Sequence, residues 1–113
     1  MTMLRYSELS PARQALVRLF QTTNFGEVRQ LRVRDSEPVL SPPPVVLFDV
    51  KLDSDEGPRP ELELQDFVLN KEVCRLLDRL SEIGNGEIER LEIRSGVPRR
   101  FLYQLSTAIV NDL

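Results

Sequence analysis

The sequence predicts an α+β protein in two layers, with a mainly antiparallel sheet of four to five strands and two helices on one face. Three observations lead to this prediction. The phrase GEVRQLRVRDSEP, residues 26–38, returns sixty positions later as GEIERLEIRSGVP, residues 86–98. An amphipathic helical pattern precedes each copy. Turn-forming residues follow each alternating stretch, as in a hairpin.

The first helix is expected from Ser10 to about Thr22. The Ser10 hydroxyl can accept a backbone N–H as the N-cap, and Pro11 suits the first helical position, where its missing N–H costs little. The residues of its apolar face, spaced i, i+3, i+4 and i+7, are Leu16, Leu19, Phe20 and Thr23. This spacing is that of one side of a helix packed on a core.

The second helix shows the same kind of face. Its apolar positions are Val73, Cys74, Leu76, Leu77, Leu80 and Ile83. Either Asn70 or Asp66 can cap its start. The run Gly84-Asn85-Gly86 is expected to end it, since these residues tolerate left-handed backbone.

A hairpin is expected after each helix. Leu31 and Val33, like Leu91 and Ile93, alternate with charged residues as in a half-buried strand. Both copies break this alternation at the same place, because Val28 and Ile88 precede the next apolar residue by three positions. The shared break predicts a bulge or an anchored helix-to-strand link. The return strands are expected at Pro38 to Leu40 and at Pro98 to about Leu105.

The segment between the copies is not repeated. Pro42-Pro43-Pro44 predicts a stiff polyproline spacer. Val45 to Leu52 predicts a strand, and residues 53–60 form an acidic loop rich in Gly and Pro. The tail, Ser106 to Leu113, fits either a short helix or a frayed end.

The repeat indicates one domain made of two helix–hairpin half-units, residues 10–40 and 66–105, joined by residues 41–65. Two strands alone are marginally stable in water, whereas two such units can cover each other's apolar faces. We therefore predict an internal duplication with approximate twofold symmetry. The alternative is a chance resemblance between two common hairpin sequences.

The composition argues against several kinds of enzyme. The chain has no His and one Cys, which rules out triads of the Ser-His-Asp and Cys-His types within one chain. Cys74 falls on an apolar helix face, where a free Cys acts as a small hydrophobic residue. In Asp53–Gly57 the glycine is fifth and the twelfth residue is Leu64, unlike an EF-hand loop. No catalytic activity, metal or cofactor is expected.

The chain is expected in the cytoplasm, without a membrane partner. No apolar run approaches the roughly 18 residues that span a bilayer. The N-terminus lacks an apolar export signal.

One functional hypothesis is nucleic-acid binding by an arginine-rich hairpin face. The candidate contacts are Arg29, Arg32, Arg34, Arg94, Arg99 and Arg100. Arginine in a strand can contact phosphates. The competing interpretation is that these arginines pair across strands with the glutamates of the same hairpins, Glu27, Glu87, Glu89 and Glu92. The net charge of −3 also weighs against a nucleic-acid partner.

The favoured hypothesis is a protein-interaction or dimerisation module, with a second copy or another protein as the partner. Val45–Leu52 and Arg99–Leu105 are the candidate edge strands for pairing. Charge is also segregated, since residues 1–34 carry six Arg against Glu8 and Glu27, and residues 35–73 carry ten acids against three bases. Such segments can meet across a twofold dimer.

The first copy resembles a known kind of small bacterial protein. The residues that carry the resemblance are Asn24-Phe25-Gly26-Glu27-Val28 and the Leu-x-Val-Arg-Asp hairpin after them. They are similar to the YezD-like proteins, which have one helix, an aromatic-Gly-x-Val link and an Asp-Gly hairpin. This chain departs from that pattern with Asp35-Ser36 at the turn. The resemblance covers at best residues 12–100 and implies a bacterial, cytosolic fold, with no site residue carried over.

Overall fold

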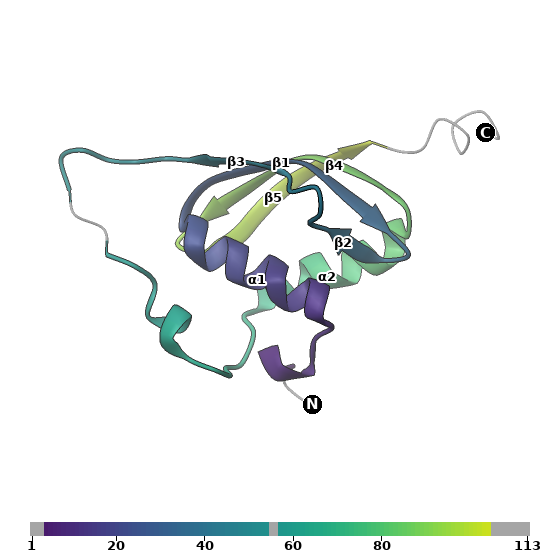
Figure 1. Cartoon of the computed structure of the whole chain (residues 1–113), viewed down its shortest axis with the longest axis horizontal. Coiled ribbons are helices and arrows are strands. Elements are labelled where there is room, and N and C mark those ends of the chain that lie inside the picture. The colour runs from purple at the N-terminus through teal and green to yellow at the C-terminus, as the bar shows by residue number, and fades with distance from the viewer. Residues whose placement is uncertain (1–3, 55–56, 105–113) are drawn as a thin grey trace.

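Two helices lie on one face of an antiparallel sheet (Figure 1). The computed structural model describes residues 4–54 and 57–104. Helix α1 spans Pro11–Thr23 and helix α2 spans Lys71–Ile83, each thirteen residues long. The predicted α+β class, with both helices on one face, is confirmed.

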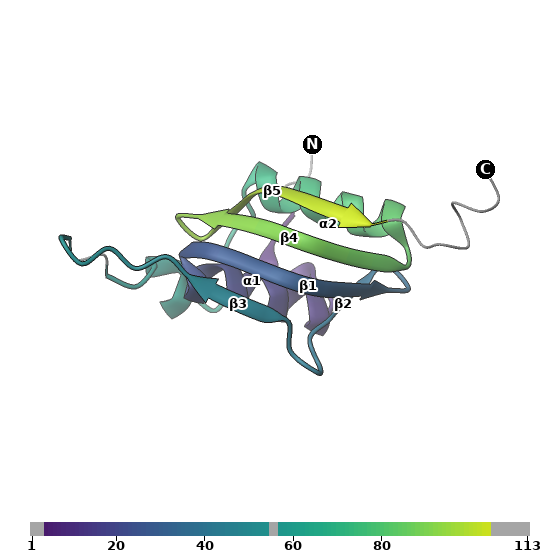
Figure 2. The ribbon, with the colours of Figure 1, turned by 90° about the horizontal axis from the view of Figure 1, so that it is seen from above.

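The sheet has five strands in the order β2-β1-β4-β5, with β3 pairing beside β2 on the same edge of β1. The bounds are β1 Phe25–Arg34, β2 Glu37–Val39, β3 Val45–Phe48, β4 Gly86–Arg94 and β5 Val97–Gln104. Figure 2 shows β1 and β4 in the middle, β5 along one edge and β3 along the other. Two short 3-10 helices, η1 at Tyr6–Glu8 and η2 at Pro60–Glu63, lie outside the sheet.

The two helices begin and end in the same way. The Ser10 hydroxyl accepts the Arg13 N–H at the start of α1, and the Asn70 side chain accepts the Val73 N–H at the start of α2. Asn70, and not Asp66, is therefore the cap of α2. The residues that end the helices, Asn24 and Gly84, have φ values of 61° and 69°, as is common at helix C-termini.

The central strand pair has twofold register. Val28 lies opposite Leu91, and Leu31 lies opposite Ile88. Each hairpin turn also donates a backbone hydrogen bond to the end of the other half's helix. These bonds run from the Ser36 N–H to the Gly84 carbonyl and from the Gly96 N–H to the Asn24 carbonyl, both 2.8 Å. The halves thus match in structure at an offset of sixty, while their descent from one ancestral unit remains a prediction.

The predicted irregularity is present in both halves. Gln30, between Val28 and Leu31, has a φ of 59°, and the β4–β5 register shifts between Ile88 and Arg90. This break lets both apolar residues before and after it face the helices. The hairpin turns are also alike, because Asp35-Ser36 and Ser95-Gly96 all have positive φ, which type I′ turns require. Asp35-Ser36 and Ser95-Gly96 therefore form the same kind of turn in the two halves.

The core fills the space between the helices and the sheet. Its buried members are Leu16, Val17, Phe20, Val28, Leu31, Val33, Leu69, Val73, Leu76, Leu77, Leu80, Ile88, Leu91 and Ile93. Both halves contribute equivalent positions. Leu31 and Leu91, for example, are each 0% exposed. Val17 is buried where the helical spacing had favoured Leu19, which is only partly buried.

The strand predicted over Val45–Leu52 ends earlier, at Phe48. The reason is the length of its partner. Phe48 pairs with Gly26, and the Asp49 N–H donates to the Phe25 carbonyl at the first residue of β1. Beyond Asp49 there is no backbone left to pair with. The first return strand likewise ends at Val39, before the Pro-rich spacer, and part of the second, at Leu105, lies outside the described residues, as does the tail.

Candidate association surface

Most of the predicted arginines lie on the sheet face opposite the helices. They alternate with residues that are buried against the helices, and those on this face are Arg29, Arg32, Arg34, Arg94 and Arg100. The sixth, Arg99, lines a groove between α2 and β5. The hairpins therefore do not gather all six into one strip.

Two glutamates on the same face bind four arginines. The ion pairs are Arg29–Glu27 at 3.0 Å, Arg90–Glu27 at 3.6 Å, Arg94–Glu92 at 3.4 Å and Arg100–Glu92 at 3.6 Å. Two of them, Arg90–Glu27 and Arg100–Glu92, cross between strands as the competing interpretation predicted. In the described part of the chain, only Arg32 and Arg34 among the arginines of this face have no ion pair. The glutamates thus neutralise much of the positive charge that a phosphate backbone would contact.

The segregated charges meet within a single chain. Arg5 binds Asp66 at 2.8 Å, and Arg13 lies 3.4 Å from Glu37. Arg18 donates to the carbonyl oxygens of Glu61 and Leu64. The basic N-terminal segment therefore binds acidic side chains and carbonyl oxygens within its own chain. These contacts do not require a dimer.

The N-terminal segment is tied to the chain just before α2. Tyr6 and Phe67 stack with their ring centroids 5.0 Å apart, and the Arg18 guanidinium lies 4.4 Å above the Tyr6 ring. The Asp66 carboxylate accepts from the Arg5 side chain and from the Ser7 N–H. The Arg5 hydrogen bond, followed by that of Ser7, lowers the pKa of Asp66 from 3.8 to about 2.

We expect this contact to weaken in acid. A pKa lowered by folding means that the ionised carboxylate stabilises the folded state, fully above about pH 4, and that this stabilisation is lost as the pH falls toward 2. Between pH 5 and pH 2, the melting temperature should fall more steeply for the wild type than for Asp66→Asn. Glu63→Gln, an exposed acid of the same segment, is the control and should follow the wild type. Parallel curves for the wild type and Asp66→Asn would contradict the assignment.

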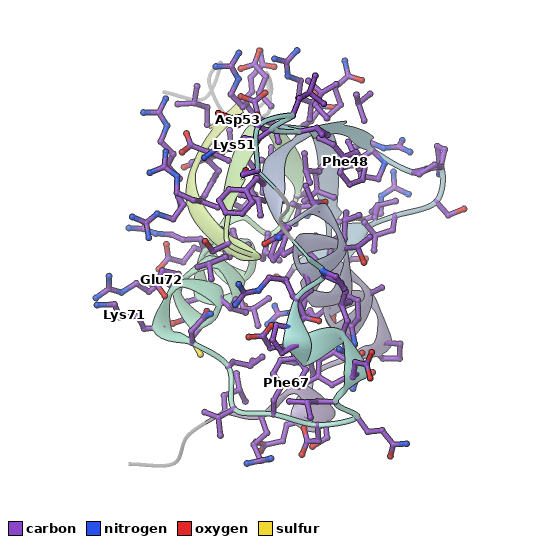
Figure 3. All side chains as sticks on the ribbon, turned by 90° about the vertical axis from the view of Figure 1, so that its left-hand side faces the viewer. Phe48, Lys51, Asp53, Phe67, Lys71 and Glu72 are labelled. Atoms are coloured by element: carbon purple, nitrogen blue, oxygen red, sulfur yellow. The ribbon has the colours of Figure 1, made fainter. Side chains whose placement is uncertain are left out.

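An apolar arm projects from the end of β3. We define the arm as residues 48–53, which begin with the last residue of β3. Exposure rises outward along it, from 58% at Phe48 to 70% at Val50 and 97% at Leu52. Figure 1 shows this segment extending past the end of the sheet, and Figure 3 views the molecule from that side, with Phe48, Lys51 and Asp53 labelled in the segment and Phe67 labelled at the opposite end of the view. β3 pairs only with β1 among the described strands, so its outer edge is unpaired.

The arm has one apolar and one polar side. Phe48, Val50 and Leu52 alternate in sequence with Asp49, Lys51 and Asp53, and an extended chain sends such residues to opposite sides. The Lys51 ammonium lies 6.0 Å from the Phe25 ring centroid, and Phe25 pairs with Arg94 on the outer sheet face. Lys51 thus lies toward the arginine side of the sheet, and Phe48, which pairs with Gly26, lies toward the helices. Within β3 itself, Val45 and Leu47 are exposed on the arginine side, opposite Arg29 and Glu27.

A groove of about 570 Å³ runs between α2 and β5. Its apolar lining consists of Leu76, Ile83, Pro98, Phe101 and Tyr103. Strand pairing puts Phe101 opposite Leu91 and Tyr103 opposite Ile88, on the helix side of the sheet, and the two rings lie 5.9 Å apart. The sequence pattern alone did not predict this groove. The alternation of Phe101 and Tyr103 with polar or exposed neighbours does indicate an apolar face on this strand. It indicates a groove only once α2 is known to lie beside β5.

The rim of the groove is mainly basic. Its charged residues are Arg75, Arg79, Arg99, Arg100, Glu72 and Glu82. Arg79 pairs with Glu82 at 3.0 Å, and Arg100 is held by Glu92. Within the described ranges, Arg75 and Arg99 make no ion pair. An occupant with acidic residues would therefore find two available cations.

Cys74 lies on α2 and is partly buried against the core. Burial raises the pKa of its thiol, and the nearby Asp78 carboxylate raises it further. A raised pKa lowers the fraction of the nucleophilic thiolate at neutral pH. This supports the structural role that its helical position predicted.

Comparison with models of protein families, with curated proteins and with solved structures gave no match. Neither α1 nor α2, the longest helices of residues 4–54 and 57–104, has the length and apolar character needed to cross a membrane. No group of three or more Cys, Asp or Glu side chains in these ranges is placed to hold a metal ion.

Proposed function

We propose that this protein is a non-catalytic association module that forms a homodimer through the arm. The observation that carries the proposal is the one-sided row of Phe48, Val50 and Leu52, whose exposure increases away from the body. Large apolar side chains gathered on one exposed surface are typical of interaction sites. An unpaired edge strand at the base of the arm adds backbone groups that another chain can pair with.

The energetics favour two arms over one. Burying three large apolar side chains supplies about 4–8 kcal/mol. Association costs about 4–15 kcal/mol in lost translational and rotational freedom. A single arm contact therefore gives weak binding at best, whereas a twofold dimer buries two arms for the same loss of freedom. A second copy is the partner that supplies this gain without further assumptions.

Nucleic-acid binding is the less favoured alternative. The arginine face that would carry it has Glu27 and Glu92 at its centre, each bound to two arginines. A phosphate backbone would have to displace these carboxylates or approach only at Arg32 and Arg34. In the arm, by contrast, the side chains of Phe48, Val50 and Leu52 remain exposed.

Light scattering after size exclusion tests the proposal. The wild type should run as a dimer of the 13.0 kDa chain, and Leu52→Glu should be mostly monomeric at the same concentration, because it puts a charge where an apolar contact is needed. Leu64→Glu is the matched control, since Leu64 is also exposed but lies outside the arm. It should remain dimeric. A wild type that stays monomeric at high micromolar concentration would remove the proposal.

A further inference from the structure

We propose that the arm of each copy lies in the α2–β5 groove of the other copy, so that the dimer forms by reciprocal exchange of arms. This inference rests on the proposed dimer and states which surface receives the arm. Within residues 4–54 and 57–104, the arm and the groove both present exposed apolar side chains. They lie on opposite edges of the sheet (Figure 2), and one chain can donate the first while it offers the second.

The groove is built to receive an extended segment. β5 pairs only with β4 among the described strands, so its outer edge has free N–H and C=O groups. A strand added there would place every second side chain over the apolar lining formed by Leu76, Ile83 and Phe101. The arm supplies this spacing, with apolar residues at Phe48, Val50 and Leu52.

The lengths also agree. The apolar row from Phe48 to Leu52 covers four residue steps, or about 13 Å in extended chain. The wall of α2 that lines the groove runs from Glu72 to Ile83, about 16 Å along a helix axis. The row therefore fits within the groove, with room for one polar residue at an end.

The charges are complementary. The polar side of the arm carries Asp49 and Asp53 with Lys51 between them. The rim of the groove offers Arg99 on β5, which makes no ion pair within the described residues. Opposite charges on two meeting surfaces favour this pair of surfaces over pairings of like charge.

Pairing of arm with arm fits less well. Beyond β3, two arms side by side would make a two-stranded ribbon whose apolar side chains share one uncovered face. A two-stranded ribbon is marginally stable in water. In the groove, α2 would cover the apolar side of the arm. An arm-to-arm contact leaves that side exposed to water.

Mixing two variants tests the exchange. One chain carries Leu52→Glu, which damages the arm and leaves the groove intact. The other carries Tyr103→Glu, which damages the groove and leaves the arm intact. We expect each variant alone to dissociate about ten- to a hundredfold more readily than the wild type, as loss of a buried apolar contact implies. Mixed in equal amounts, they should form a heterodimer with one intact contact, visible by native mass spectrometry.

The matched control is Leu102→Glu. Leu102 is the neighbour of Tyr103 and is similarly exposed, at 55% against 47%, but it pairs with Arg90 on the opposite face of the sheet. It should leave the dimer unchanged. Circular dichroism should give all three variants the wild-type fold. Arg75→Glu, at an exposed position of α2 on the rim of the groove, provides a second groove variant should Tyr103→Glu unfold.

The outcomes separate this inference from the proposed dimer. A dimer that Leu52→Glu breaks, but that Tyr103→Glu and Arg75→Glu both leave intact, would overturn the groove and keep the arm as the dimer contact. A mixture in which the heterodimer is no more populated than either variant's homodimer would also overturn the exchange, because only the heterodimer keeps one undamaged contact. A monomeric wild type would remove both proposals.

Discussion

Replacing Leu31 or Leu91 with alanine is expected to lower the free energy of unfolding by about 2–5 kcal/mol. Both side chains are 0% exposed, and each lies opposite the partner half's apolar strand residue, Ile88 or Val28. Each substitution removes the transfer energy of the lost methyl groups and leaves a cavity between helix and sheet. This is a large part of the total stability of a domain of this size, about 5–15 kcal/mol.

The decrease in the free energy of unfolding should also be similar for the two alanine variants, because the register places Leu31 and Leu91 in equivalent surroundings. Urea unfolding followed by circular dichroism gives both values. Arg32→Ala, at an exposed position of the same strand, is the control and should change stability by less than about 0.5 kcal/mol. A cost confined to one of the two leucines would show that the halves are not energetically equivalent, despite their matching geometry.

Gly26→Ala is the second substitution with a large expected effect. A Cβ at Gly26 would lie 1.9 Å from the Leu47 carbonyl oxygen, and the φ of this residue is +156°. The backbone of β3 must move away, and the strained conformation adds about 1–3 kcal/mol. We expect β3 to detach from β1, with loss of hydrogen-exchange protection at the Asp49 N–H.

The equivalent glycine of the second half is the control. A Cβ at Gly86 would lie 3.1 Å from the Ile83 Cγ2, the end of a side chain that can adjust. Gly86→Ala should therefore cost much less and leave β5 protected. Equal costs at both positions would mean that the approach of β3 to Gly26 is not what requires the glycine there.

The difference between these two glycines illustrates what the repeat does not determine. Both occur in the same phrase, Gly-Glu followed by Val or Ile. Only at Gly26 would a Cβ clash with another strand's backbone, because residues 45–48 of the unrepeated segment return to the edge of β1. At Gly86 the backbone oxygen of Gln104 would lie 3.6 Å from a Cβ, which is an ordinary contact. A pattern of residues does not reveal which unrepeated segment will fill an edge.

The arginines show a similar division. Their alternation with apolar residues predicted a shared face of the sheet, and five of the six arginines lie on that face. The sequence did not decide between a binding strip and ion pairs, because that depends on which strands are neighbours. Once β1 and β4 lie side by side, Glu27 comes within 3.6 Å of Arg90, and the ion-pair interpretation follows.

The sequence by itself determined the helices, the Ser10 cap of α1 and the shared break in both long strands, because each depends on residues close together in the chain. The two-layer class followed from the repetition of this local pattern in the second half. The tertiary structure alone decided the central β1–β4 pair, the early end of β3, the projecting arm and the α2–β5 groove. These features arise where segments tens of residues apart meet or fail to meet. The local pattern of residues does not reveal how long the partner strand is, or which element packs against a given surface.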